Sequence, residues 1–515
     1  AESLLTFAIL WPPCLQMTPL SACNFGPGVT ANVSSLTACA TALRGQLEAD
    51  EVRFEADESE TNTFYLLFCA ALVFLMQAGF ALLSAGSVRM RSVKNILLKS
   101  VMDACFGGLV WYLIGFGFAY DKSEDGNAFI GGSGHNFALS GADDTTGKKD
   151  YGHDAVFFFF QYCFAAAAAT ITSGAVAERC TLVGYCAYVF AIVGFVYPTV
   201  VHWVWDEHGF LSAFNKDAML TGMVDFAGSG VVHMTGGICA FTGAFIIRPR
   251  KGRFGELPEH AFAGQSASLQ VLGTFLLWFG WYGFNPGSTL ALHNYARDAA
   301  RAAVTTTLSA ATAATTGLLL KRFAPGSCGG SHGVWDLGHT CNSLLGGLVS
   351  ITAGCTTVEI WASVVIGFIG AFFYHGASCL MRRLKIDDPL DAFAVHGACG
   401  LWGCLAVGFF CTCDYSYTES GTACGVFYGG DGLLLATQIV GTIFITLWVG
   451  ALSAILFSGL MAGGLLRISK EVEDAGLDNS KHGGAAYPDI ATAIEEATER
   501  ITPKRITSAT DAAGA

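Results

Sequence analysis

Long apolar runs recur along this chain and limit its possible folds more than any other feature. Eleven stretches of about 20 residues are apolar and nearly uncharged, near 63–87, 95–120, 154–178, 181–204, 226–248, 266–286, 302–321, 337–354, 358–380, 392–412 and 432–464. Only 13% of the 515 residues are charged, whereas soluble domains carry about 25%. Because lipid offers no partner to an unpaired backbone group, each span must be helical. We predict an all-α polytopic membrane protein with eleven transmembrane helices.

Basic residues alternate between the predicted loops and indicate an orientation. Arg and Lys follow the odd-numbered spans, whereas the other loops are acidic, mixed or short. The positive-inside rule then places the N-terminus outside and the C-terminus in the cytosol. We expect an extracellular tail (1–61), an eleven-span membrane domain (62–465) and a cytosolic tail (466–515). The net charge of −13, with acid gathered near both ends, gives no indication of nucleic acid as a partner.

The outer tail and the cysteines give few functional signals. Asn32 begins the glycosylation sequon Asn-Val-Ser. If this tail lies outside, Cys14, Cys23 and Cys39 are expected to pair with each other or with a neighbouring subunit. Cys411 and Cys413, at the end of a span, are interpreted as structural. No pair of Cys-x-x-Cys motifs indicates zinc, so we expect no bound metal.

The fifth and tenth spans begin alike, which indicates an internal repeat. One begins "DFAGSGVVHMTGG" and the other "DPLDAFAVHGACG", so Asp225 precedes His233 by eight residues, as Asp388 precedes His396. Spans one to five and six to ten then form two related halves. Because each half has five spans, an odd number, the second half is inverted in the membrane. A substrate path is expected where such halves meet. Since intramembrane ionisable residues usually mark a pathway or proton relay, we predict that the histidines meet there; the alternative for either is a hydrogen-bonded core histidine.

Several long motifs carry a resemblance to a known family. "DFAGSGVVHMTGG", "FGWYGFNPGS", "ITSGAVAER" and "DDPLDAFAVHGACG" resemble the ammonium transporter family of Amt, Mep and Rh proteins, in its plant and algal high-affinity form. The resemblance covers roughly 62–488. It implies an eleven-span inverted 5+5 repeat with a final helix, assembled as a homotrimer in the plasma membrane with one pore per subunit. It also implies a transporter, not an enzyme, that needs no cofactor.

The resemblance assigns roles to residues along the pore. From the outside inward, they are Phe160, Trp205 and Ser288 in the outer recruitment site, Phe164 and Phe284 in a stacked phenyl gate, and His233 and His396 in the pore. Asp225 matches the family aspartate near the outer site and has two interpretations. Either its charge attracts the cation, or its carboxylate caps a helix that starts at Phe226.

The chemistry of these residue types suits ammonium, with methylammonium as its analogue. Aromatic faces attract a cation by about 0.5–2 kcal/mol each, and the Ser288 hydroxyl oxygen can accept an N–H. Potassium donates no hydrogen bond, so a site that requires donation discriminates against it. An ammonium ion in an apolar pore would bear a large desolvation cost, which deprotonation avoids. We expect saturable, electrogenic uptake in which ammonia passes the gate and the proton is transferred separately, with the histidines ordering ammonia or relaying the proton.

The stretch "RISKEVEDAGLDNSKHGG" resembles the family's regulatory tail, which couples neighbouring subunits. Ser480 stands where plant relatives carry a phosphorylatable threonine, so a kinase is an expected partner. A phosphate there would undock the tail through its negative charge. The alternative is an ordinary exposed serine.

Three other functions remain open at this point. The first is an electroneutral ammonia channel of the Rh type, and the second is an ammonium sensor with little transport. The third, a membrane enzyme that binds haem or metal through His233 and His396, is disfavoured because neither has Cys, Asp or Glu at ligand spacing within its span.

Overall fold

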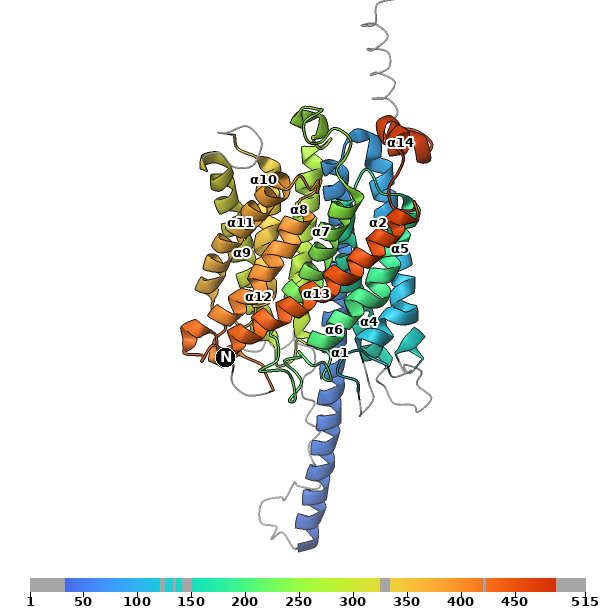
Figure 1. Cartoon of the computed structure of the whole chain (residues 1–515). Coiled ribbons are helices and arrows are strands. Elements are labelled where there is room, and N and C mark those ends of the chain that lie inside the picture. Colours follow the sequence, from blue (N-terminus) through green and yellow to red (C-terminus); the bar gives the residue numbers. More distant parts are fainter. Residues whose placement is uncertain are drawn as a thin grey trace, which may run out of the picture. The chain divides into compact units, whose positions relative to one another are not determined.

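The computed structural model describes residues 33–120, 126–132, 136–140, 151–324, 334–419 and 423–487. It divides into two units, residues 1–64 and residues 65–515. Within the described ranges every regular element is a helix, with isolated bridges in place of strands. The helices of the second unit pack side by side as a bundle (Figure 1). The expected all-α architecture is confirmed.

A helix occupies each of the eleven predicted spans. In order, they are α1 (Val33–Ser87), α2 with α3 (Val93–Val110, Phe116–Ala119), α4 (Tyr151–Ala175), α5 with α6 (Leu182–Ala191, Tyr197–Trp205), α7 (Thr235–Ile247), α8 (Ala267–Phe284), α9 (Ala296–Phe323), α10 (Leu337–Thr352), α11 (Ile360–Arg383), α12 (Cys399–Phe410) and α13 (Leu433–Ala462). In the described residues, nine helical stretches are long and apolar enough to cross a membrane. The other two spans are α8 and α10; α10 has only 16 residues.

Short turns join or begin several of these helices. Turns of π-helix link α2 to α3 (η4, Trp111–Gly115) and α5 to α6 (η6, Ile192–Val196), and two more precede α7 (η7, Ser229–Met234) and α12 (η10, Phe393–Ala398). The spacing of apolar residues in the sequence did not predict these wider turns. They matter because η7 and η10 carry His233 and His396.

Two helix starts differ from the prediction. α1 begins at Val33 rather than near 63; residues 46–60, which include five Glu and two Ala, favour helix. The fifth span begins at Ser229 rather than at Phe226, because Gly228 takes a left-handed conformation with φ of 102°. Other helices begin at side-chain caps, as where the Thr181, Ser266 and Asp336 side chains accept backbone N–H groups at the starts of α5, α8 and α10.

A close crossing of backbones brings the two halves together. A Cβ atom on Gly237 of α7 would lie 2.1 Å from the backbone nitrogen of Gly397 in η10. No side chain fits there, so the two glycines let α7 and η10 touch directly. The crossing fixes the neighbouring turn of η10 against the start of α7.

Buried ion pairs tie four loops together at one end of the bundle, here called the tail side. Arg250 lies 2.6 Å from Glu178 and 2.8 Å from Asp387, and Arg89 also pairs with Glu178. Burial alone would raise the pKa of both carboxyls, but the guanidinium groups outweigh burial and lower it, in Asp387 to well below the usual range. The loops after spans one, three, five and nine thus share one charged network.

The polar tail lies against this network. It forms α14 (Lys470–Ala475) and α15 (Leu477–Lys481). The Asp478 carboxylate accepts the backbone N–H groups of Lys94 and Asn95, at 2.9 and 3.0 Å, at the first turn of α2. Glu473 receives the N–H of Lys251 at 2.7 Å and pairs with Arg467 at 2.9 Å. Carboxylates from both α14 and α15 therefore dock the tail.

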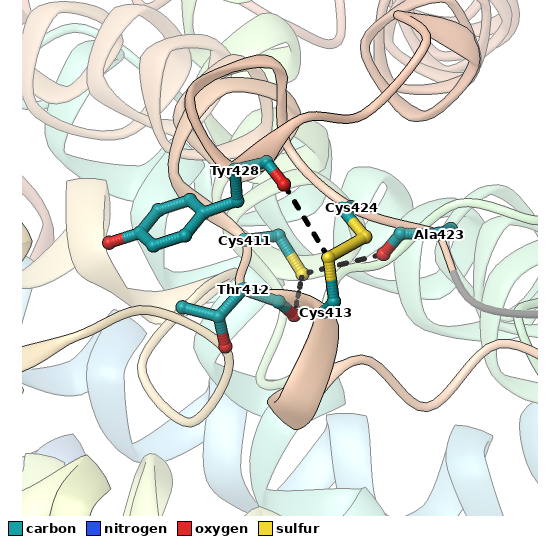
Figure 2. The surroundings of a disulfide bond; sticks show 6 residues. All are labelled: Cys411, Thr412, Cys413, Ala423, Cys424 and Tyr428. Carbon is teal, nitrogen blue, oxygen red and sulfur yellow. Dashed lines mark hydrogen bonds between the residues drawn. A yellow bond between two sulfur atoms is a disulfide. The ribbon is translucent and has the colours of Figure 1, made fainter.

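A disulfide closes a loop between α12 and α13. Cys413 is bonded to Cys424, eleven residues further along the chain (Figure 2). Cys411 stays a free thiol, buried, with its sulfur facing the carbonyl oxygens of Thr412 and Ala423. Of the two cysteines interpreted as structural, one is thus a cross-link and the other packs as a small buried side chain. Asn32, Cys14 and Cys23 lie outside the described residues, whereas Cys39 on α1 is disulfide-bonded.

Candidate substrate pathway

Two histidines from different halves of the chain meet inside the bundle. The Nδ1 atoms of His233 in η7 and His396 in η10 lie 3.2 Å apart, and the rings are nearly parallel, with centroids 5.2 Å apart. Both side chains are buried. Because one Nδ1 must donate and the other accept, the pair shares a single proton across this contact. The Nε2 atom of His233 has no hydrogen-bond partner among the described residues, so it can interact with a small ligand.

Each histidine turn is preceded by an aspartate, which is buried in the case of Asp225 and partly buried in the case of Asp388. The Asp225 carboxylate accepts the N–H groups of Gly228, Gly230 and Val231 at 3.2, 2.9 and 2.9 Å. The Asp388 carboxylate accepts the N–H of Phe393 at 2.9 Å. Burial raises the pKa of both aspartates to about 6, and N–H donors oppose the rise in both. These contacts favour the capping interpretation of Asp225, although the capped turn starts at Ser229.

A small aromatic cavity lies on the side of the histidine pair away from the tail. Its volume is about 70 Å³, and Phe160, Trp205 and Ser288 line it, as does Phe164. The Ser288 hydroxyl donates to the carbonyl oxygen of Phe284 at 2.8 Å, which leaves the Ser288 oxygen free to accept a hydrogen bond. Asp225 does not line the cavity; its carbonyl oxygen holds the Trp205 indole N–H at 2.7 Å.

Two stacked phenyl rings separate this cavity from the histidines. The ring centroids of Phe164 on α4 and Phe284 at the end of α8 lie 4.1 Å apart at an angle of 30°. The His233 ring lies 5.4 Å beyond Phe284. No open passage crosses rings in such contact, so a molecule that passes must displace at least one of them.

Beyond the histidines, two connected cavities lead to the tail side. A narrow cavity of about 20 Å³ is lined by His396, Phe80 and Thr170, among others. It shares Leu83, Asn342 and Leu390 with a larger cavity of about 360 Å³. The latter is lined by residues at the end of α1 and the start of α10, among others, so it opens at the tail side. The aromatic cavity, the phenyl pair, the histidine pair and these cavities therefore follow one another along one line of the bundle.

The sequence interpretation missed several residues of this pathway. Tyr120, Phe157, Gln161, Phe214, Phe226 and Leu290 also line the aromatic cavity. The indole of Trp281 stacks on His233 with centroids 5.1 Å apart. Gln161 stands three residues before Phe164, and Trp281 three residues before Phe284, so helical spacing was the one signal that pointed to them.

The remaining sequence predictions concern Ser480 and bound metal. Ser480 is exposed on α15, two residues after Asp478, which caps α2. Within the described residues, no group of three or more His, Cys, Asp or Glu side chains is arranged to hold a metal ion.

Comparison with known proteins places this chain in a family. Residues 64–487 match the Ammonium Transporter Family. Ammonium transporter 1 member 2 of Arabidopsis thaliana is 47% identical over 421 residues, which are 79% of each chain. Ammonium transporter 1 member 1 of Oryza sativa subsp. japonica is 46% identical over 451 residues, covering 84% of this chain and 87% of the relative.

Solved structures share the fold. A protein called Sensor Amt Protein has a TM-score of 0.72 and 31% identity and covers 83% of this chain and 100% of its own. Mep2 of Candida albicans has a TM-score of 0.68 and 28% identity, and the match covers 80% of this chain and 87% of Mep2. The chain belongs to the ammonium transporter family and is similar to its plant type 1 members.

Proposed function

We propose that this protein takes up ammonium in a saturable and electrogenic manner. The observation that carries the proposal is the linear order of an aromatic cavity, a phenyl pair and a buried histidine pair. The aromatic faces of Phe160 and Trp205 replace part of the hydration of a cation. The Ser288 oxygen, whose own proton is already donated, accepts one ammonium N–H.

Ammonium gives up its proton before it enters the narrow part of the pathway. The phenyl pair and the 20 Å³ cavity leave no room for a hydration shell, and an unhydrated charge there would be very costly. Neutral ammonia passes as the rings of Phe164 and Phe284 move aside. The proton travels separately through the histidine pair, where His233 and His396 exchange it across their Nδ1 contact.

The topology and the tail follow the same proposal. We place the N-terminal tail (1–61) outside and the tail after Leu466 in the cytosol of a cell with this protein in its plasma membrane. The protein acts as a homotrimer without a cofactor, and phosphorylation of Ser480 would undock the tail held by Asp478.

Voltage-clamped oocytes that express the chain test the proposal. Ammonium is titrated at several external pH values, and the current is compared with that of His233→Ala and His396→Ala. We expect a saturating inward current that follows ammonium rather than ammonia and is lost in both variants, with each variant still at the cell surface. Wild-type current in both variants would exclude the histidine relay.

Two alternatives give different results in the same experiment. Uptake of methylammonium without current would identify an electroneutral ammonia channel. Neither current nor uptake, with the protein at the surface, would favour a sensor, the role after which one structural relative is named.

A further inference from the structure

A line of buried polar side chains runs along α2, outside the pathway described above. Asn95, Lys99 and Asp103 are spaced four residues apart and are 2%, 1% and 0% exposed. The opposite face of α2 exposes Leu98, Val101 and Leu109. We call Asn95, Lys99 and Asp103 the α2 polar stripe. A carboxylate and an amine inside a membrane helix are costly, and usually serve a function.

One end of the stripe reaches the wall of the pore. Thr170 of α4 lines the narrow cavity together with His396, and its hydroxyl interacts with Asp103. In the structure this hydroxyl has two acceptors for its single proton, Gln77 Oε1 and the carbonyl oxygen of Ala166, each at 2.9 Å. Rotation about one bond turns the same O–H toward Asp103. Asp103 Oδ1 is buried without a hydrogen-bond partner among the described residues, so it is open to a proton.

The other end of the stripe reaches the tail. Lys99 Nζ donates to the carbonyl oxygen of Cys180 at 2.8 Å, and Asn95 Nδ2 lies 2.8 Å from His482 Nε2. Tyr185 bridges the middle, since its hydroxyl donates to Asp103 while the Lys99 amine lies 5.3 Å from its ring centroid. The remaining titratable groups around Lys99 are Arg179, Cys180 and Cys186.

We propose that Asp103 is a proton acceptor beside the ammonia path, and that the α2 polar stripe conducts the proton from the pore to the tail side. This inference rests on the proposed electrogenic function and adds a route for its proton. An ammonia molecule and a proton that cross together would recreate the charged ion in the narrow cavity, whereas a lateral route keeps them apart.

Each step of this route exchanges one bond to hydrogen for another. An imidazolium of the histidine pair loses its N–H proton to the Thr170 oxygen, and the Thr170 proton passes to Asp103 Oδ1, which forms a neutral carboxylic acid. Lys99 releases one ammonium proton toward the tail-side water and takes up the Asp103 proton. Asp103 and Lys99 then return to their starting charges.

The test is the charge moved per substrate molecule, measured by current and labelled methylammonium uptake in the same oocyte. The variant Asp103→Asn keeps the size of the side chain and an acceptor for the Tyr185 hydroxyl. We expect its proton flux to fall by about a hundredfold, a typical contribution of a positioned acid–base group, while part of the uptake persists. The charge per methylammonium then approaches zero. Asp103→Glu should restore it, and Asp217→Asn, at an exposed aspartate, should leave it unchanged.

A second variant covers the case in which Asp103→Asn does not reach the cell surface. Thr170→Val removes the hydroxyl that faces the pore and leaves Asp103 in place, and it should lower the charge per methylammonium in the same way. A wild-type ratio in Asp103→Asn, or in Thr170→Val when the first variant is not at the surface, would overturn the proton route alone. If current and uptake fall by the same factor, the proton route is likewise overturned, because such a loss indicates that the substituted residue has a structural role. A wild-type protein that takes up methylammonium without current would instead overturn the proposed electrogenic function.

Discussion

The two histidine turns are built on the same plan but are stabilised unequally. In each, an aspartate stands eight residues before the histidine and accepts backbone N–H from the start of a π-helical turn. Asp225 uses both carboxylate oxygens and accepts three N–H groups. Asp388 accepts the N–H of Phe393 with one oxygen, while its other oxygen is buried without a partner among the described residues.

The surroundings of the two aspartates differ as well. The Asp225 turn lies next to the aromatic cavity, where its carbonyl oxygen also orients the Trp205 indole. Asp388 follows Asp387, which joins the buried network of Arg250 and Glu178. The first turn is thus held by its own carboxylate, whereas the second is held largely by ion pairs next to it. The repeat has kept the positions of the acid and the base but has changed what fixes them.

The largest expected effect comes from removing the fully bonded cap. Asp225→Ala leaves three buried N–H groups without an acceptor, and each such loss costs about 1–3 kcal/mol. Because the turn that carries His233 is then no longer held in place, we expect methylammonium uptake to fall by more than about tenfold. Asp225→Asn keeps one acceptor oxygen and should retain part of the uptake. Complete loss in both variants, with normal surface labelling, would show that the charge of Asp225 matters and not its cap.

An intermediate effect is expected at the matching position of the second half. Asp388→Ala removes a single N–H acceptor and leaves the pair of Arg250 with Asp387 in place. Uptake should therefore fall by about tenfold or less, and Asp388→Asn should be close to wild type. Uptake assays of both variants beside the two Asp225 variants test whether the loss is smaller at Asp388 than at Asp225. Equal losses in the two alanine variants would show that the halves are stabilised alike.

Sequence patterns predicted the plan of this pathway but not what fixes it. Hydropathy located all the spans, because lipid forces each backbone into helix. The eight-residue echo and the resemblance together named the pairs that the structure brings into contact, Phe164 with Phe284 and His233 with His396. The missed features depend on contacts far apart in the sequence. Asp478 caps α2 by accepting the N–H of Asn95, 383 residues earlier, and no local pattern records such a contact.

A smaller effect distinguishes the carboxyls by pH. Burial raises the pKa of Asp225 and Asp388 to about 6, above the unfolded value of about 3.9. A raised pKa in the folded state contributes stability that is full below the unfolded value and is lost as the pH rises through about 6. Asp387 has a lowered pKa, so its contribution does not change between pH 7 and 5. Thermal unfolding of the purified proteins should therefore show that the wild type gains stability from pH 7 to 5 relative to Asp225→Asn and to Asp388→Asn.

The smallest expected effect separates the causes of the two raised pKa values. Burial raises both, but the neighbouring Asp391 carboxylate raises that of Asp388 in addition. Asp391 has a φ of 56°, a conformation that asparagine also adopts, so Asp391→Asn removes the charge without straining the backbone. The pKa of Asp388 should then fall, and its part of the stability gain should move to lower pH, by a shift in unfolding temperature on the order of 1–2 °C.

The control is the double variant Asp391→Asn with Asp388→Asn. Its pH profile of unfolding temperature should match that of Asp388→Asn alone. If Asp391→Asn still shifts the unfolding temperature in the double variant, Asp391 does not act through Asp388. It then acts through Tyr374 and Ser378, whose hydroxyls donate hydrogen bonds to its carboxylate at 3.0 Å.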